Sequence, residues 1–414
     1  MPKACEIERC QVQPDTRGTR VSVRDGEMPN LTSDIPSPVK LKVGMIGGGE
    51  GAYFGSLHRA AMRLCNRYEL VAGVFSSHAE KSLAAGHALG VTTPRIYASA
   101  QQMASAEAGR ADPIDAVIIV TPNHLHFEAC QAFLHAGIAV ICDKPLVNEI
   151  DQANELKRLA AERNTFFALT YTYQGYPMVR EARRRIQDGA IGEVRFIQVQ
   201  YLLEWLAPGV QSLNASLAWR GERAKAGISS VVGDIGTHAF NLMEFLTGQR
   251  AQALSATLSN KVPGWKMDDN CVAQFEFSQA IEGLMWVSFA APGHRNGLAF
   301  KVIGSRASLE WSQESPELLH LKPVDSAELI LRRGQADNLE SQAFSSLPAG
   351  CSEGYLEALA ILYQDFAVAI AAGEQRSGVL RIPVPDLEQG CRGVELAHLC
   401  FESSTNRKWV RFAR

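Results

Sequence analysis

Two short stretches of the chain carry side chains suited to acid–base chemistry. Lys144 stands between Asp143 and Pro145, directly after an apolar run that reads as a buried strand. Farther along the chain, Asp234 and His238 are four residues apart, a spacing that places two side chains on one face of a helix. We therefore expect Lys144, Asp234 and His238 to form one catalytic site.

The chemistry that these three side chains fit is hydride transfer from an alcohol. A secondary alcohol releases a hydride only if a base takes its hydroxyl proton, and an imidazole such as His238 titrates near neutral pH. Lys144 would donate to the reacting oxygen and stabilise the negative charge that develops there. Asp234 would bind substrate or orient the imidazole. A carboxylate near a helix N-terminus is also favoured by the helix dipole alone, so a purely structural role for Asp234 stays open.

The elements that must position Lys144 are the strands of a parallel sheet. Apolar runs alternate with segments of helical spacing, which is typical of βαβ units. In open sheets of this kind, ligands bind at the carboxyl edge of the strands, where Lys144 stands. The predicted strands are Leu41 to Ile46, Glu69 to Phe75, Ala116 to Val120, Ile138 to Cys142 and Phe166 to Tyr171.

The first predicted strand runs into a glycine-rich loop that a helix follows. Glycines allow positive φ and let a pyrophosphate approach backbone N–H groups at the start of a helix. Five residues separate Gly49 from Gly55, so the loop is longer than the G-x-G-x-x-G pattern. We expect the cofactor to be bound here by Gly47, Gly49, Gly51 and Gly55.

The end of the second predicted strand bears on the choice of cofactor. An acidic residue there would bind the ribose 2′-hydroxyl of NAD, but the chain has Ser76 and Ser77 instead. Both hydroxyls can bind either a ribose hydroxyl or a 2′-phosphate. The sequence therefore predicts NAD or NADP without deciding between them.

Four motifs together resemble the Gfo/Idh/MocA family, named after glucose–fructose oxidoreductase, inositol dehydrogenase and rhizopine catabolism. The resemblance runs from about residue 41 to the C-terminus. In that family the Asp-Lys-Pro motif at 143–145 is usually Glu-Lys-Pro, so the side chain of Asp143 is one methylene shorter than the usual glutamate. The motifs are the glycine loop followed by His58, Thr-Pro-Asn-x-x-His at 121–126, Asp-Lys-Pro at 143–145 and Gly-Asp-Ile-Gly-Thr-His at 233–238.

The resemblance implies an α/β fold with two domains. An N-terminal Rossmann domain would be followed by an α/β domain with a large, open, mostly antiparallel sheet. The implied reaction transfers a hydride between a nicotinamide cofactor and a secondary hydroxyl or ketone of a sugar, an inositol or a related polyol. The implied cofactor contacts include Thr121, Pro122, Asn123, His126, Asp143 and Lys144.

Further substrate contacts are expected from aromatic and basic residues near the site. Trp219 and Arg220 stand in a loop ahead of the catalytic segment, and Tyr173 follows the last strand of the first sheet. A sugar-stacking face and a hydroxyl donor are one interpretation of these side chains. Anchoring of the loop is an equally good one.

The chain divides into three segments on its sequence pattern. Residues 1–40 lack the periodicity of a core and read as a flexible extension. Residues 41–170 form the predicted Rossmann domain, and residues 171–414 form the predicted domain for substrate binding and oligomerisation. Within that last domain we expect a hairpin at Gln279-Ala280 and an irregular surface segment at 323–353. In relatives the open sheet face commonly mediates oligomerisation, so a homodimer or homotetramer is expected.

Composition excludes several other classes of protein. A net charge of −3 lacks the excess of positive charge that is typical of proteins binding nucleic acid. No apolar run is long enough to span a membrane. Nine cysteines without a C-x-x-C pair argue for a reducing, cytoplasmic compartment. Asp234 and His238 have no third metal ligand at a recognisable spacing, so no metal site is expected.

Two other functions remain as alternatives. An NAD-dependent glycosidase-type enzyme would retain its cofactor and release no net NADH. A non-catalytic dinucleotide-binding regulator would not need Lys144, Asp234 and His238 together, so we disfavour it.

Overall fold

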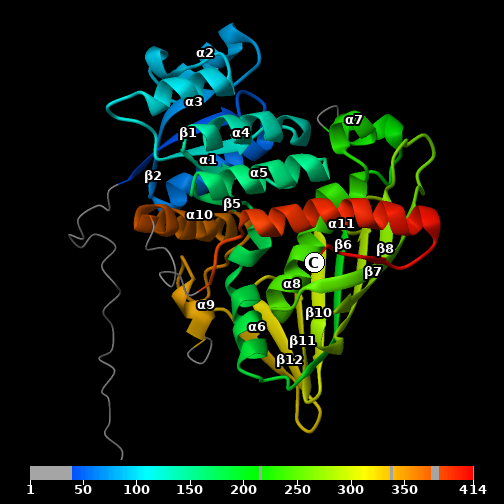
Figure 1. Cartoon of the computed structure of the whole chain (residues 1–414). Coiled ribbons are helices and arrows are strands. Elements are labelled where there is room, and N and C mark those ends of the chain that lie inside the picture. The colour runs from blue at the N-terminus through cyan, green and yellow to red at the C-terminus, as the bar shows by residue number, and fades with distance from the viewer. Residues whose placement is uncertain (1–39, 214–216, 336–338, 374–381, 414) are drawn as a thin grey trace, which may run out of the picture. The chain divides into compact units, whose positions relative to one another are not determined.

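The N-terminal part of the chain forms a parallel sheet of five strands (Figure 1). The glycine loop and Lys144 each follow one of these strands, at the carboxyl edge of the sheet. The computed structural model describes residues 40–213, 217–335, 339–373 and 382–413. The predicted extension at 1–40 lies outside these residues, apart from Lys40. In spatial order the strands are β2 (Tyr68–Val74), β1 (Leu41–Gly47), β3 (Ala116–Val120), β4 (Ala139–Cys142) and β5 (Phe167–Leu169).

Helices cover both faces of this sheet, which explains why its strands are apolar almost throughout. Val43 and Met45 of β1 face one apolar cluster, and Ile46 faces the other. On the first face lie α1 (Tyr53–Cys65) and α10 (Tyr355–Ala372). On the second lie α3 (Ala100–Ala108), α4 (His126–His135) and α5 (Ile150–Glu162), while α2 (Ala79–Ala88) follows β2.

The second half of the chain forms a sheet of nine strands that is antiparallel apart from the β6–β9 pair. Its core-facing positions pack against helices α6 (Pro177–Gln187) and α8 (Thr237–Thr247). The predicted α/β fold, with a parallel sheet followed by a second, mostly antiparallel sheet, is thereby confirmed. In spatial order the strands are β13 (Leu329–Arg332), β12 (Leu318–Pro323), β11 (Ala307–Ser312), β10 (Gly297–Gly304), β6 (Val194–Leu202), β9 (Glu282–Ser288), β8 (Asn270–Phe277), β7 (Ala251–Ser259) and β14 (Val410–Arg411).

The C-terminal helices return to the first sheet. Tyr363 and Phe366 of α10 are buried in the same cluster as Val43 and Met45 of β1. Helix α11 (Leu387–Asn406) contacts α5 on one side and α8 and β7 on the other. By length and composition α10 is the one described helix able to cross a membrane, but 56% of it is buried and it serves as a core helix.

Two local predictions have opposite outcomes. The hairpin at Gln279-Ala280 is confirmed, and both residues adopt positive φ where β8 turns into β9. The irregular segment predicted at 323–353 is wrong in part, because β13 extends the sheet there and α9 (Leu339–Ala343) follows. Arg333 within this segment is buried and pairs with Glu317, which a surface excursion would not require.

A buried ion pair fastens α6 to α10. The Arg180 Nη2 lies 2.6 Å from the Asp365 Oδ2, and both side chains are nearly inaccessible. The guanidinium also donates from Nε to the carbonyl oxygen of Gln174 and lies over the Phe344 ring. Removal of one partner from such a pair leaves an uncompensated charge in the core.

We predict that Asp365→Ala destabilises the protein by about 3–5 kcal/mol, because Arg180 would remain buried without its counter-ion. Urea unfolding followed by circular dichroism measures the change. Glu155→Ala is the control, since it removes a solvent-exposed ion pair with Arg158 within α5. If both variants unfold at the same urea concentration, the buried pair contributes no more than an exposed one.

Candidate active site

An ion pair joins the two halves of the chain at the carboxyl edge of the first sheet. Lys144, just beyond β4, donates from Nζ to the Asp234 Oδ1 and to the Asp234 carbonyl oxygen, both at 2.8 Å. Arg220 donates from Nε to the other carboxylate oxygen, also at 2.8 Å. Asp234 is thus held between two cations, one of which, Lys144, lies 90 residues earlier in the chain.

Asp234 lies in a single π-helical turn (Val232–Gly236) that leads directly into α8. The sequence predicted a simple helix start here, with the acid and His238 on one face. A π turn is wider than an α turn and recurs at functional sites. Within this turn the Asp234 carbonyl oxygen accepts from Lys144.

His238 is buried among tyrosine rings and makes no hydrogen bond through Nδ1 to any described residue. The Tyr173 ring meets the imidazole edge to face at 5.0 Å between centroids, and the Tyr171 ring does so at 5.8 Å. Because Nδ1 is enclosed, Nε2 is the nitrogen available to a substrate proton. Burial, and then the charge of Lys144, hold the pKa of His238 well below its usual range, against the opposing effect of Asp234.

Asp234 does not orient the imidazole in this structure, which corrects one of its two expected roles. Its carboxylate is occupied by Lys144 and Arg220. Burial alone would raise the pKa of Asp234, but the two neighbouring cations hold it well below its usual range. The carboxylate therefore stays ionised and holds the Lys144 ammonium in place.

The other substrate candidates lie close to this pair. Arg220 is buried against Asp234, and its guanidinium lies 4.6 Å from the centroid of the Trp219 ring. Tyr173 is almost fully buried, with its ring against His238 and its hydroxyl donating to the Tyr201 hydroxyl at 2.7 Å. Arg220 and Tyr173 thus shape the surroundings of Asp234 and His238.

Sequence reasoning missed Tyr201 and Asn296. The Tyr201 hydroxyl donates to the Asn296 Oδ1 at 2.7 Å, which extends the hydroxyl chain that starts at Tyr173. Burial raises the pKa of Tyr201 above its usual range, so this phenol stays a donor. One signal was present: Tyr201 continues the core-facing alternation of Ile197 and Val199 and puts a hydroxyl near the end of this strand.

The glycine loop has the features that a pyrophosphate needs. Gly47 and Gly51 have positive φ, and nothing lies within 4 Å of the position that a Cβ on Gly51 would take. A Cβ on Gly49 would lie 2.3 Å from the Phe75 carbonyl oxygen, so no larger residue fits there. Gly55 packs equally closely on the Gly48 backbone.

Helix α1 begins beside this loop without a side-chain cap and without an acid in its first turn. Its first N–H groups are therefore available to an anion. A pocket lies between the loop and α2, and Ser56 and Arg59 contribute to its lining. These features fit a dinucleotide, and Ser76 and Ser77 stand at the neighbouring end of β2, where Ser77 is exposed.

The residues expected after β3 divide into two groups. Thr121, Pro122 and Asn123 stand at the carboxyl edge, and the Thr121 Oγ1 is buried without a hydrogen-bond partner among the described residues. His126 is fully buried, with Nε2 2.8 Å from the Thr121 carbonyl oxygen and Nδ1 2.9 Å from that of Pro145. This placement favours a role in holding the ends of β3 and β4 together over direct contact with a cofactor.

Comparison with known protein families matches both halves of the chain. Residues 41–171 match the family described as "Oxidoreductase family, NAD-binding Rossmann fold". Residues 179–310 match the family described as "GFO/IDH/MocA C-terminal domain". The two matches follow the division between the two sheets.

Similar proteins span nearly the whole chain. YfiI of Bacillus subtilis, an uncharacterised oxidoreductase, is 32% identical over 384 residues, which cover 90% of this chain and 97% of that protein. Levoglucosan dehydrogenase of Pseudarthrobacter phenanthrenivorans is 25% identical, covering 89% of this chain and 97% of that protein.

The fold is also similar to a solved structure with bound cofactor. An inositol dehydrogenase homologue from Azotobacter vinelandii, complexed with NAD+, is 32% identical and superposes with a TM-score of 0.86. The match covers 91% of this chain and 98% of that one. The chain belongs to the Gfo/Idh/MocA family of oxidoreductases.

Proposed function

We propose that this protein transfers a hydride between NAD or NADP and a secondary hydroxyl or ketone of a sugar, an inositol or a related polyol. The observation that carries the proposal is the arrangement of Lys144 on Asp234, with His238 following in α8. Relatives named for levoglucosan, inositol and D-xylose support the substrate class. One of them is named as NADP-dependent, which supports NADP as a candidate cofactor beside NAD.

Each residue of the site has a distinct task in this reaction. His238 accepts the hydroxyl proton at Nε2, which requires Nδ1 to carry the ring proton. Lys144 donates from Nζ to the same oxygen and stabilises its developing charge. Asp234 holds the lysine, and Arg220 holds Asp234 from the other side.

The cofactor would be held by the glycine loop, by Ser76 and Ser77, and by the edge formed by Thr121 and Asp143. When bound, the nicotinamide supplies the hydride acceptor or donor that no protein side chain provides. The buried surroundings of Lys144 and His238 keep bulk water from the reacting oxygen and strengthen the interactions made with it.

The first test is a screen of inositols, aldoses and anhydrosugars with NAD+ and NADP+, read as formation of the reduced cofactor. We expect net reduction with at least one polyol, followed by turnover in both directions. A product without net reduced cofactor would instead indicate the glycosidase-type enzyme. Cofactor binding without any conversion would indicate the regulator.

We predict that Lys144→Met lowers kcat by about a hundredfold or more, because the reacting oxygen loses its cationic donor while side-chain length is kept. Steady-state kinetics measures the loss on the substrate that the screen identifies. NADH affinity, measured by fluorescence titration, should change little and serves as the control for folding. Near-normal turnover in this variant would remove Lys144 from the mechanism.

The lowered pKa of His238 determines how kcat/KM for alcohol oxidation depends on pH. Because the neutral imidazole is the base, kcat/KM for alcohol oxidation should stay constant as pH falls through about 6.5 and decline only below it. In Lys144→Met the decline should move to higher pH, since a neighbouring positive charge is gone. A wild-type decline centred at or above pH about 6.5 would contradict the assignment.

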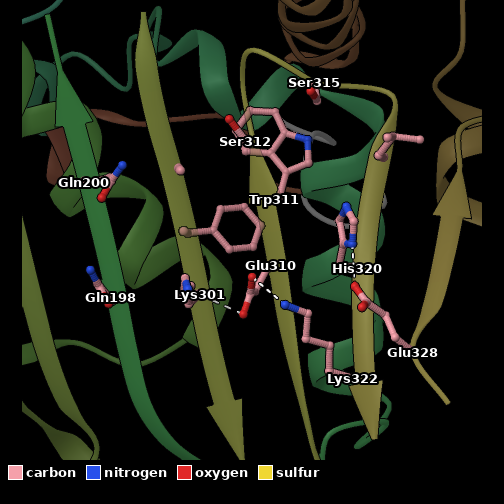
Figure 2. Close-up of a pocket in the computed structure, with 13 residues that line it drawn as sticks. Gln198, Gln200, Lys301, Glu310, Trp311, Ser312, Ser315, His320, Lys322 and Glu328 are labelled. Atoms are coloured by element: carbon pink, nitrogen blue, oxygen red, sulfur yellow. Dashed lines mark hydrogen bonds and ion pairs between the residues drawn. The ribbon is translucent and has the colours of Figure 1, made fainter. Parts of the chain in front are cut away.

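The open face of the nine-stranded sheet is the surface that we propose for self-association. Figure 2 shows a groove on this face, where Glu310 pairs with Lys322 and His320 pairs with Glu328. On the same face, Trp286 and Ile303 are exposed by 40% and 43%. Side chains of the opposite face pack on α6 and α8.

We predict that the wild type is a dimer or tetramer of the 45.2 kDa chain and that Trp286→Arg with Ile303→Glu gives monomers. The two substitutions replace exposed apolar side chains of this face by charges, which would be desolvated without partners if the face is the interface, and so oppose association. Light scattering during gel filtration measures the mass. Leu83→Arg, on exposed α2, is the control and should keep the wild-type mass. A monomeric wild type would end this proposal.

A further inference from the structure

His58, which belongs to the glycine-loop motif, has no place in the mechanism above. It lies on α1, is only 2% exposed, and its Nδ1 is 2.7 Å from the Tyr363 hydroxyl oxygen. The two rings meet edge to face. Tyr363 comes from α10, so this contact joins the first helix of the chain to a helix near its end.

The other nitrogen of His58 faces the residue that precedes Lys144. Nε2 lies 3.9 Å from the Asp143 Oδ2. The second oxygen of Asp143 accepts from the Thr170 hydroxyl at 2.6 Å and from the Lys144 backbone N–H at 2.9 Å. Asp143 is thus bound on one side by the backbone of the catalytic lysine and faces His58 on the other.

The tautomer of His58 follows from these neighbours. Burial, more than any other effect, holds the pKa of His58 below its usual value; Arg59 adds to this and Asp143 opposes it. A neutral imidazole carries one proton, and a lone pair directed at the Asp143 carboxylate would be repelled by it. The favoured tautomer therefore has Nε2–H towards Asp143 and Nδ1 accepting from the Tyr363 hydroxyl.

We propose that His58 and Tyr363 are positioning residues that set the Asp143 carboxylate, and through it the Lys144 backbone, for cofactor binding and hydride transfer. This inference rests on the proposed function, because Asp143 is one of the expected cofactor contacts. Neither His58 nor Tyr363 need touch the substrate. The Tyr363 hydroxyl selects the tautomer, and Nε2–H, at 3.9 Å from the Asp143 Oδ2, attracts the carboxylate electrostatically and not through a hydrogen bond.

Tyr68 offers a matched control within the same aromatic cluster. Its ring meets Tyr363 edge to face at 5.3 Å, and its hydroxyl donates to the Tyr363 carbonyl oxygen at 2.6 Å. Tyr68→Phe and Tyr363→Phe each remove one buried hydroxyl that is bonded in this cluster. Only the second removes a contact with His58.

The experiment compares these two variants by thermal melting, NADH fluorescence titration and steady-state kinetics. We expect both to melt at similarly lowered temperatures. Tyr363→Phe should lose about tenfold or more in kcat/KM or in NADH affinity, while Tyr68→Phe stays within about twofold of the wild type. Equal kinetic and binding effects of the two changes would overturn the inference.

Two substitutions of His58 test the donor itself. The amide N–H of Gln occupies roughly the place of Nε2–H, whereas Leu has a similar volume and no donor. His58→Gln should retain NADH affinity within about threefold, and His58→Leu should lose about tenfold or more. If Leu performs as well as Gln while both proteins fold, His58 only fills space.

The outcomes separate this inference from the function on which it rests. A wild-type protein that neither binds NADH nor oxidises a polyol contradicts the proposed function. A wild type that does both, with His58→Leu and Tyr363→Phe unaffected, contradicts the positioning role alone.

Discussion

The partly buried ion pair between Lys144 and Asp234 is the interaction on which the site depends. It joins the carboxyl edge of the first sheet to the π turn before α8, and Arg220 completes it from a third segment. Taking such charges out of water costs several kcal/mol per ion, which only good geometry and extra hydrogen bonds offset. The second contact of Lys144, with the Asp234 carbonyl oxygen, is one such bond. Lys144 is therefore held only when the two halves of the chain pack in one relative position.

The same burial prepares the base. Tyrosine rings enclose His238, and its Nδ1 has no polar partner among the described residues. Burial and the charge of Lys144 lower the pKa of the imidazole, which therefore stays neutral beside the lysine. A neutral imidazole can take a proton, and a charged lysine can stabilise the oxygen that loses it. Asp234 makes both states compatible, because its negative charge compensates Lys144 without protonating the ring. The geometry thus divides acid and base roles between two neighbouring side chains.

Much of the site could be predicted from the sequence, because a local sequence pattern specifies local secondary structure. The apolar strand before Asp143 placed Lys144 at a sheet edge, and the spacing of Asp234 and His238 placed them near one helix start. Contacts between distant segments were not readable. Nothing near Asp234 indicated Arg220 as its partner, and nothing in α10 showed that Tyr363 would reach His58. β13 was missed because it has only four residues, Leu-Ile-Leu-Arg, which show no alternation and stand in a polar segment.

A double-mutant cycle on Lys144 and Asp234 tests the central claim most directly. Lys144→Met, Asp234→Asn and the double variant would be compared with the wild type in kcat/KM on one substrate. If Asp234 acts by holding Lys144, the change at Asp234 should matter little once the lysine is gone. The kcat/KM of the double variant should therefore be about tenfold or more higher than the product of the two single losses predicts. Losses that multiply to within about twofold would show that the two side chains act independently and would contradict the account.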